Sequence, residues 1–185
     1  ANIVFDHNYL EGAGVNIEGA RTNLCLQSEA LNTSPWLAPN STMTENAEIA
    51  PSGTKTATDI IHLDTNDNVV QSITVSADTV YTASIHVGKG TTGNHQWIHL
   101  IWNEANADNG ASIWFDRING VMGATQANGT GTYIDSGFFK LPNGDYRIWV
   151  AGVIASGQTD GMIRVQNTAN GTGTTTSTAT SAAYW

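Results

Sequence analysis

Tryptophan, histidine and charged residues recur at alternating positions in short apolar stretches of this sequence. HQWIHLIWN contains Trp97 and His99, and ASIWFDR contains Trp114 and Asp116. A flat indole covers the C–H face of a sugar ring, while carboxylate, imidazole and guanidinium groups make directed hydrogen bonds to hydroxyls. These residue types therefore favour carbohydrate recognition, provided that their side chains gather on one surface.

Alternation along the strands supplies such a surface in the prediction. Successive side chains of an extended chain point to opposite faces of a sheet. Four stretches each have one plainly apolar face, and their opposite face lacks Lys and carries large rings, which usually mark an interaction site on a solvated sheet. The predicted ligand-binding residues on that face are Trp97, Trp114, Trp149, His86, His99, Asp116 and Arg147.

The other parity of the same stretches predicts the core. It includes Trp102, which shares its face with Ile98 and Leu100. The remaining predicted core residues are Tyr81, Ala83, Ile85, Val87, Ile113, Phe115, Tyr146, Ile148 and Val150.

Two alternatives to the binding face stay open. A tryptophan at position 97, 114 or 149 could be covered by the N-terminal segment and enlarge the core, and His86 and His99 could be hydrogen-bonded structural residues. A bulge would exchange the two faces of a strand. Replacement of Trp114 by Ala separates the alternatives, because it weakens glycan binding in one and abolishes folding in the other.

Composition favours a single all-β domain. The chain has 185 residues, of which 40% are hydrophobic and 12% are charged, and Thr, Ser, Asn and Gly take the place of helix-forming residues. Short strands separated by turn residues predict an antiparallel two-sheet β-sandwich with jelly-roll topology. We expect one domain over residues 1–185, partly irregular over 1–40, with a Thr/Gly-rich segment over 168–185 that ends in a last strand.

Charge and cysteine content exclude several classes of protein. The net charge of −9 disfavours partners such as nucleic acid and anionic membrane surfaces, and no apolar run has transmembrane length. Cys25 is the one cysteine, so an internal disulfide cannot form; its flanking leucines favour a buried apolar role.

Three segments together resemble known families. IEGARTNLCLQSEALNTSPW (17–36) and DSGFFKLPNGDYRIWV (135–150) resemble segments of phage tail and other virion structural proteins, although Asp145 replaces the usual tryptophan of the second. VVQSITVSADTVYTASIHVGKG (69–90) resembles a stretch shared with jelly-roll carbohydrate-binding modules of cellulases and xylanases. The resemblance implies a non-catalytic β-sandwich, in a virion or a secreted enzyme and hence extracellular, that binds a polysaccharide or a cell-surface glycan.

Other functions remain as alternatives. A virion tail or decoration domain could use the aromatic face to pack on other domains of a larger parent protein. A polysaccharide lyase or glycosidase is disfavoured because the predicted face carries one clear acid, whereas glycosidases use two. We expect no required cofactor; a structural Ca²⁺ could occupy the Asx-rich turns at 64–68 or 104–109, with Asp6 as a further ligand, although such turns usually cap themselves.

Overall fold

Alternating apolar residues and turn residues divide the chain into short strands. The computed structural model describes residues 2–4, 16–18, 22–39, 41–63, 67–89, 95–172 and 181–184, and none of these residues is helical. Within this part of the chain, no helix is long and apolar enough to cross a membrane. The strands are β1 (Asn2–Val4), β2 (Asn16–Glu18), β3 (Ser41–Glu48), β4 (Ala57–His62), β5 (Val69–Thr74), β6 (Tyr81–Lys89), β7 (Trp97–Glu104), β8 (Gly110–Asp116), β9 (Val121–Asn128), β10 (Thr132–Lys140), β11 (Tyr146–Val153), β12 (Asp160–Thr168) and β13 (Ser181–Tyr184).

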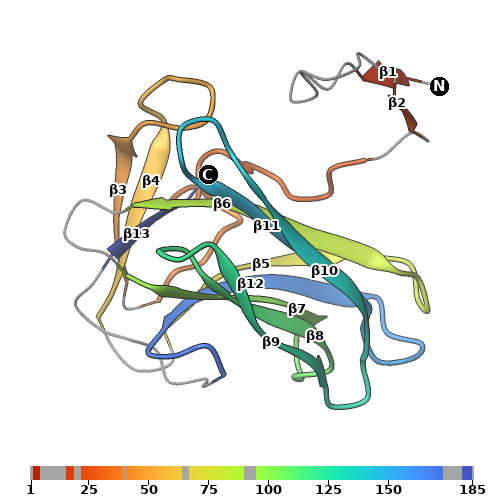
Figure 1. Ribbon diagram of the computed structural model, residues 1–185. Coiled ribbons are helices and arrows are strands. Elements are labelled where there is room, and N and C mark those ends of the chain that lie inside the picture. Colours follow the sequence, from red (N-terminus) through yellow and green to blue (C-terminus); the bar gives the residue numbers. More distant parts are fainter. Residues whose placement is uncertain are drawn as a thin grey trace.

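Two sheets form the body of the molecule (Figure 1). One has six strands in the order β10-β11-β6-β13-β4-β3, and the other has five in the order β5-β12-β7-β8-β9. β1 pairs with β2, and the strand pairs are antiparallel throughout. The predicted all-β antiparallel sandwich is therefore confirmed, while the jelly-roll topology stays a prediction.

The core lies between the sheets and is built from the parity class that the sequence predicts. Register places Leu100 opposite Ile113 in the five-stranded sheet and Ile148 opposite Ile85 in the six-stranded sheet. All four side chains are buried in one apolar cluster. Trp102, which is 3% exposed, belongs to the same cluster, as predicted.

Aromatic rings connect the two layers. Phe115 of β8 lies with its ring centroid 4.9 Å from that of Tyr146 and 4.9 Å from that of Phe138, both in the six-stranded sheet. Trp102 of β7 contacts Tyr81 of β6 at a centroid distance of 5.8 Å. These tilted and edge-on arrangements are the ones that aromatic quadrupoles favour.

The turn INGV, residues 118–121, closes the β8–β9 hairpin. The N–H of Gly120 donates to the carbonyl oxygen of Asp116 over 2.8 Å. Gly120 has φ of +65°, and a Cβ there would lie 2.6 Å from the hydroxyl of Tyr146. Glycine is therefore favoured at position 120 both by the left-handed backbone conformation and by the close approach of the Tyr146 side chain.

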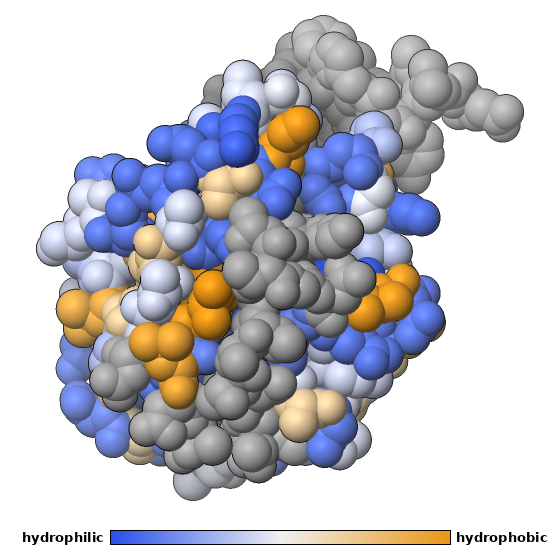
Figure 2. Space-filling view, turned by 90° about the vertical axis from the view of Figure 1, so that its left-hand side faces the viewer, coloured by the Kyte–Doolittle hydropathy of each residue, from blue (hydrophilic) through white to orange (hydrophobic). Residues whose placement is uncertain are grey.

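The outside of the sandwich carries small apolar patches. Figure 2 shows hydrophobic residues separated by hydrophilic ones over the described part of one side. Single exposed apolar residues are normal for a folded protein. Hydropathy alone therefore marks no binding surface on that side.

A pair of matched substitutions tests the assignment of the core. Leu100→Ala should lower the free energy of unfolding by about 2–5 kcal/mol, because it removes buried methyl groups and leaves a cavity. Leu26→Ala, at a side chain that is 63% exposed, should change it by less than about 1 kcal/mol. Urea unfolding of both variants measures the difference, and equal effects would contradict this core.

Candidate functional site

The seven predicted site residues lie on the outer faces of opposite sheets. The His99 face, on β7 and β8 of the five-stranded sheet, holds Trp97, His99, Trp114 and Asp116. The Trp149 face, on β6 and β11 of the six-stranded sheet, holds His86, Arg147 and Trp149.

The predicted single platform of exposed indoles does not form. Trp149 lies on the other sheet from Trp97 and Trp114, and Trp114 is 1% exposed. Alternation along a strand assigns a residue to a face of its own sheet, but it does not determine which sheet the strand joins. The pattern was right about the outward direction of these side chains and wrong about their common surface.

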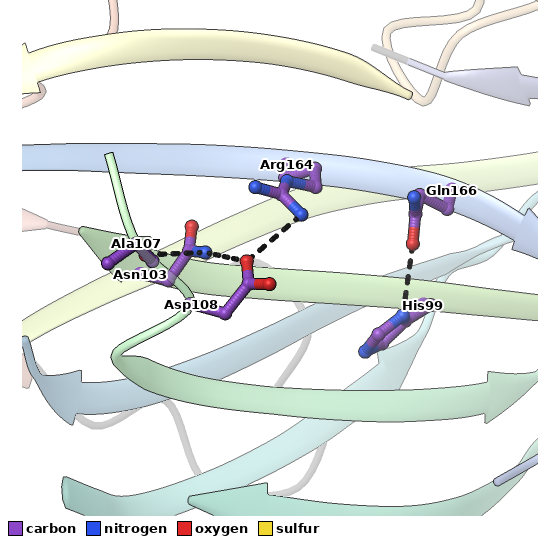
Figure 3. Close-up of polar contacts among 6 residues, drawn as sticks. All are labelled: His99, Asn103, Ala107, Asp108, Arg164 and Gln166. Atoms are coloured by element: carbon purple, nitrogen blue, oxygen red, sulfur yellow. Dashed lines mark hydrogen bonds and ion pairs between the residues drawn. The ribbon is translucent and has the colours of Figure 1, made fainter. Parts of the chain in front are cut away.

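On the His99 face, a histidine stacks on a tryptophan from the neighbouring strand. The rings of His99 and Trp114 lie 3.8 Å apart between centroids and 11° from parallel, and register makes the two residues direct partners. Nδ1 of His99 lies 3.3 Å from Oε1 of Gln166 on β12 (Figure 3). Since an amide oxygen only accepts, this contact places the imidazole proton on Nδ1 and leaves Nε2 as an acceptor.

Burial keeps the imidazole of His99 neutral. Desolvation lowers its pKa to about 3, the hydrogen bond with Gln166 opposes that shift, and the positive charge of Arg164 adds to it. His62 on β4 is similarly shifted, to a pKa of about 4, mainly by desolvation. Both imidazoles are therefore uncharged at neutral pH.

A loop folds back over one end of the His99 face. Nη1 of Arg164 lies 3.3 Å from Oδ1 of Asp108, and Nδ2 of Asn103 donates to the same oxygen over 3.1 Å and to the carbonyl of Ala107 over 3.4 Å (Figure 3). Asn103 is fully buried although it points away from the core. This loop thus shields the outer side of β7.

Four polar atoms of this face have no hydrogen-bond partner among the described residues. They are Nε2 of His99, Oδ1 of Asn103, Oγ of Ser112 and Nε of Arg164. A buried polar group without a partner costs about 1–3 kcal/mol. Two acceptors, one hydroxyl and one N–H donor make a set that hydroxyl groups can satisfy.

Trp97 is held from the side by two glycines. A Cβ at Gly171 would lie 2.5 Å from the indole, and one at Gly123 would lie 2.8 Å from it. The carbonyl of Gly171 accepts from the N–H of Ala124 over 3.0 Å, which ties the segment after β12 to β9. The half-buried Trp97 ring is therefore packed between backbone segments.

Asp116 caps the β8–β9 turn. One oxygen of its carboxylate accepts from the backbone N–H groups of Ile118 and Asn119, and the other accepts from the side-chain amides of Asn119 and Gln96. Burial raises the pKa of Asp116, but the hydrogen bonds from Asn119, Gln96 and Ile118 outweigh it and hold the pKa below its ordinary value. All four contacts are internal, as expected for an Asx turn.

The Trp149 face is built around an indole that packs against a glycine of the neighbouring strand. Register sets Trp149 between Gly137 on β10 and Ser84 on β6. A Cβ at Gly137 would lie 2.9–3.0 Å from three indole atoms, so only glycine lets the ring rest on the backbone of β10. The indole is half-buried, with one side against this strand.

Charged and polar side chains adjoin the indole. Arg147 is exposed, lies between His86 and Phe139 in the register, and donates from Nη2 to Oγ of Ser84 over 3.0 Å. Phe139 is 63% exposed and was not among the predicted site residues. The sequence could have identified Phe139, because two adjacent phenylalanines on a strand point to opposite faces. One ring therefore points outward when the other enters the core.

The predicted calcium ligands are only partly described. Asp6 and residues 64–66 lie outside the described part of the chain, whereas the carboxylate of Asp67 accepts a backbone N–H four residues earlier. Glu104 accepts from the side-chain amide of Asn109. No group of three or more His, Cys, Asp or Glu residues placed to hold a metal occurs among the described residues.

In comparisons with known proteins, no family profile and no curated sequence matches this chain. The assignment of function therefore rests on the geometry of the two faces.

Two tryptophan substitutions should separate the structural ring from the accessible one. Trp114→Ala should lower the free energy of unfolding by about 3–5 kcal/mol, the usual cost of truncating a buried aromatic residue. Trp149→Ala should cost no more than about 1–2 kcal/mol, because its ring packs on one side only. Thermal and urea unfolding measure both, and a folded, stable Trp114→Ala protein would contradict the burial of this ring.

Stability should fall in mild acid because of the buried histidines. The pKa of His99 is lowered from the ordinary value of about 6.5, so the unfolded chain binds a proton that the folded protein excludes. Between pH 7 and pH 5 this histidine should cost about 2 kcal/mol of stability. His99→Phe keeps a ring against Trp114 without a titrating group, so its unfolding free energy should fall by about 2 kcal/mol less than that of the wild type between pH 7 and pH 5. The same pH dependence in both proteins would rule out this role of His99.

Proposed function

We propose that the protein binds carbohydrate without cleaving it and that the sugar docks on the Trp149 face. The observation that carries the proposal is the indole of Trp149, which rests on the backbone at Gly137 beside the exposed side chains of Arg147 and Phe139. A flat ring with polar groups at its margin suits a ligand with both C–H faces and hydroxyls.

Each neighbouring residue has a proposed role. Trp149 stacks on one sugar ring and Phe139 on the next, while Arg147, Ser84 and His86 hydrogen-bond to hydroxyl groups. By analogy with bases stacked on aromatic side chains, each ring contributes about 1–3 kcal/mol. Two rings and a few exchanged hydrogen bonds correspond to a dissociation constant on the order of micromolar to millimolar.

The remaining predicted site residues receive structural roles in this proposal. His99 and Trp114 stabilise the five-stranded sheet by stacking, Trp97 packs under the segment after β12, and Asp116 caps a turn. The partially unpaired polar groups around His99 are the second choice for a ligand site, because hydroxyls would satisfy them but the surrounding side chains are buried.

Chemistry favours binding over cleavage at this face. Among the residues of β6, β10 and β11 whose register directs them outward, Asp135 is the one carboxylate. Hydrolysis of a glycosidic bond normally uses two carboxyl groups about 5–9.5 Å apart. Stacking and hydrogen bonding need no cofactor, and the proposed setting is extracellular, on a virion or as part of a secreted polysaccharide-degrading enzyme.

Assembly of a virion tail or decoration is the second candidate. It is favoured by Phe139 and Ile134, which are 63% and 50% exposed on β10, a strand at the edge of its sheet. Apolar side chains on an edge strand suit contact with another protein. In that case tryptophan fluorescence changes with protein concentration, whereas in the first it changes with added oligosaccharide.

Replacement of Trp149 tests the proposed site. On a polysaccharide and glycan panel, Trp149→Ala should weaken binding at least tenfold relative to the wild type, because a stacking surface is lost. Val121→Ala, on β9 of the other sheet, is the matched control and should bind normally. Reducing-end assays on the same panel should detect no cleavage. Unchanged affinity in Trp149→Ala, with the melting temperature preserved, would place the site elsewhere.

A further inference from the structure

Within the described part of the chain, Arg147 is a cation without an acidic partner, in a protein rich in acidic residues. The chain has seven Lys and Arg residues against sixteen Asp and Glu. Arg164 pairs with Asp108, and the buried Arg117 donates to the carbonyl of His95. Among the described residues, Arg147 instead contacts the neutral hydroxyl of Ser84.

The outward carboxylate of β10 lies away from Arg147. Register puts Asp135 opposite Ala151, two residues beyond Trp149 and therefore on the far side of the indole from Arg147. Four residues along a strand correspond to about 13 Å, so Asp135 does not neutralise the guanidinium. A sugar stacked on Trp149 would have a cation at one end and an acid at the other.

The guanidinium retains unused donors. An arginine has five N–H groups in a planar fork, of which Ser84 takes one at Nη2. A carboxylate matches that fork with two parallel charge-assisted hydrogen bonds, which neutral hydroxyls do not provide. Arg147 lies two residues from Trp149 on the same face of β11, about 7 Å along the strand. Its guanidinium is therefore within reach of a substituent on the stacked sugar or on the next sugar.

From this arrangement, and resting on the proposed function, we infer that the Trp149 face selects a glycan in which a carboxylate-bearing sugar, of the uronic acid class, is joined to neutral sugars. Arg147 binds the carboxylate and Trp149 stacks on the adjacent ring. The protein's net charge of −9 repels a dense polyanion, so the expected ligand carries isolated carboxylates in place of a continuous run.

Matched oligosaccharide pairs test this selectivity. Short gluco-, xylo- and galacto-oligosaccharides, each with or without one terminal glucuronic acid, are titrated by calorimetry against the wild-type chain. For the backbone that binds, the acidic member should bind about tenfold more tightly than the neutral one, and added salt should narrow the difference. Equal affinity for the two members would overturn the inference.

Variants then assign the effect to one side chain. Arg147→Gln should weaken binding of the acidic member more than that of the neutral member and so remove the preference between them. Arg147→Lys should keep part of the preference, because the fork is lost but the charge remains. Lys140→Gln removes the same charge from an exposed position at the end of β10 and should keep the full preference. A preference that persists in Arg147→Gln would overturn the role of this residue.

Failure of the inference can be distinguished from failure of the proposed function. If the wild type binds both members equally and Trp149→Ala binds neither, carbohydrate binding stands and the uronic acid preference is wrong. If no pair binds the wild type at all, both proposals are wrong. Melting temperatures of all variants confirm that altered binding does not come from unfolding.

Discussion

The contact of Phe115 with Tyr146 and Phe138 fixes which neighbouring side chains of β8, β10 and β11 point outward. Its ring lies 4.9 Å from each of the other two between centroids, and these three residues join the two sheets. Because side chains alternate along a strand, an inward residue obliges its neighbours to point outward. Trp114, Arg147 and Phe139 each follow or precede one of these rings and therefore lie on the outer faces.

The two outer faces that result have different physical character. On the five-stranded sheet, every residue of β8 is buried, so both faces of this strand are shielded from water. Polar residues there bond with one another, as His99 does with Gln166, or remain unpartnered, as Oγ of Ser112 does among the described residues. Such a face contributes rigidity at the cost of desolvating polar groups.

The outer face of β6, β10 and β11 keeps its polar groups in contact with water. Arg147 is exposed there, and Gly137 allows the Trp149 indole to lie against the strand. A half-buried aromatic ring beside an exposed guanidinium that contacts a neutral hydroxyl contributes little to folding stability, since exposed polar contacts are weak. This low structural value, together with the chemistry of the residues, supports the proposal that the face recognises a ligand.

Particular residues show which features of the structure could be predicted from the sequence. Alternation placed Leu100 and Trp102 in the core and Trp114 outside it, because the direction of a side chain along a strand depends on local backbone geometry. The strand β9 was not anticipated, since Gly123 and its small neighbours in VMGATQAN interrupt the alternation of apolar residues. Phe139 was missed because only its neighbour Phe138 fits an apolar core position.

By itself the sequence determined the class of fold, the two-sided character of the central strands and the excess of acidic charge, all of which follow from residue type and a period of two. Only the tertiary structure decided that Trp149 and Trp114 belong to opposite sheets, that His99 and Trp114 are buried, and that Asp116 caps a turn. These properties depend on which strands pair and which loops cover them. Pairing and covering are long-range contacts, and no local alternation of residues encodes them.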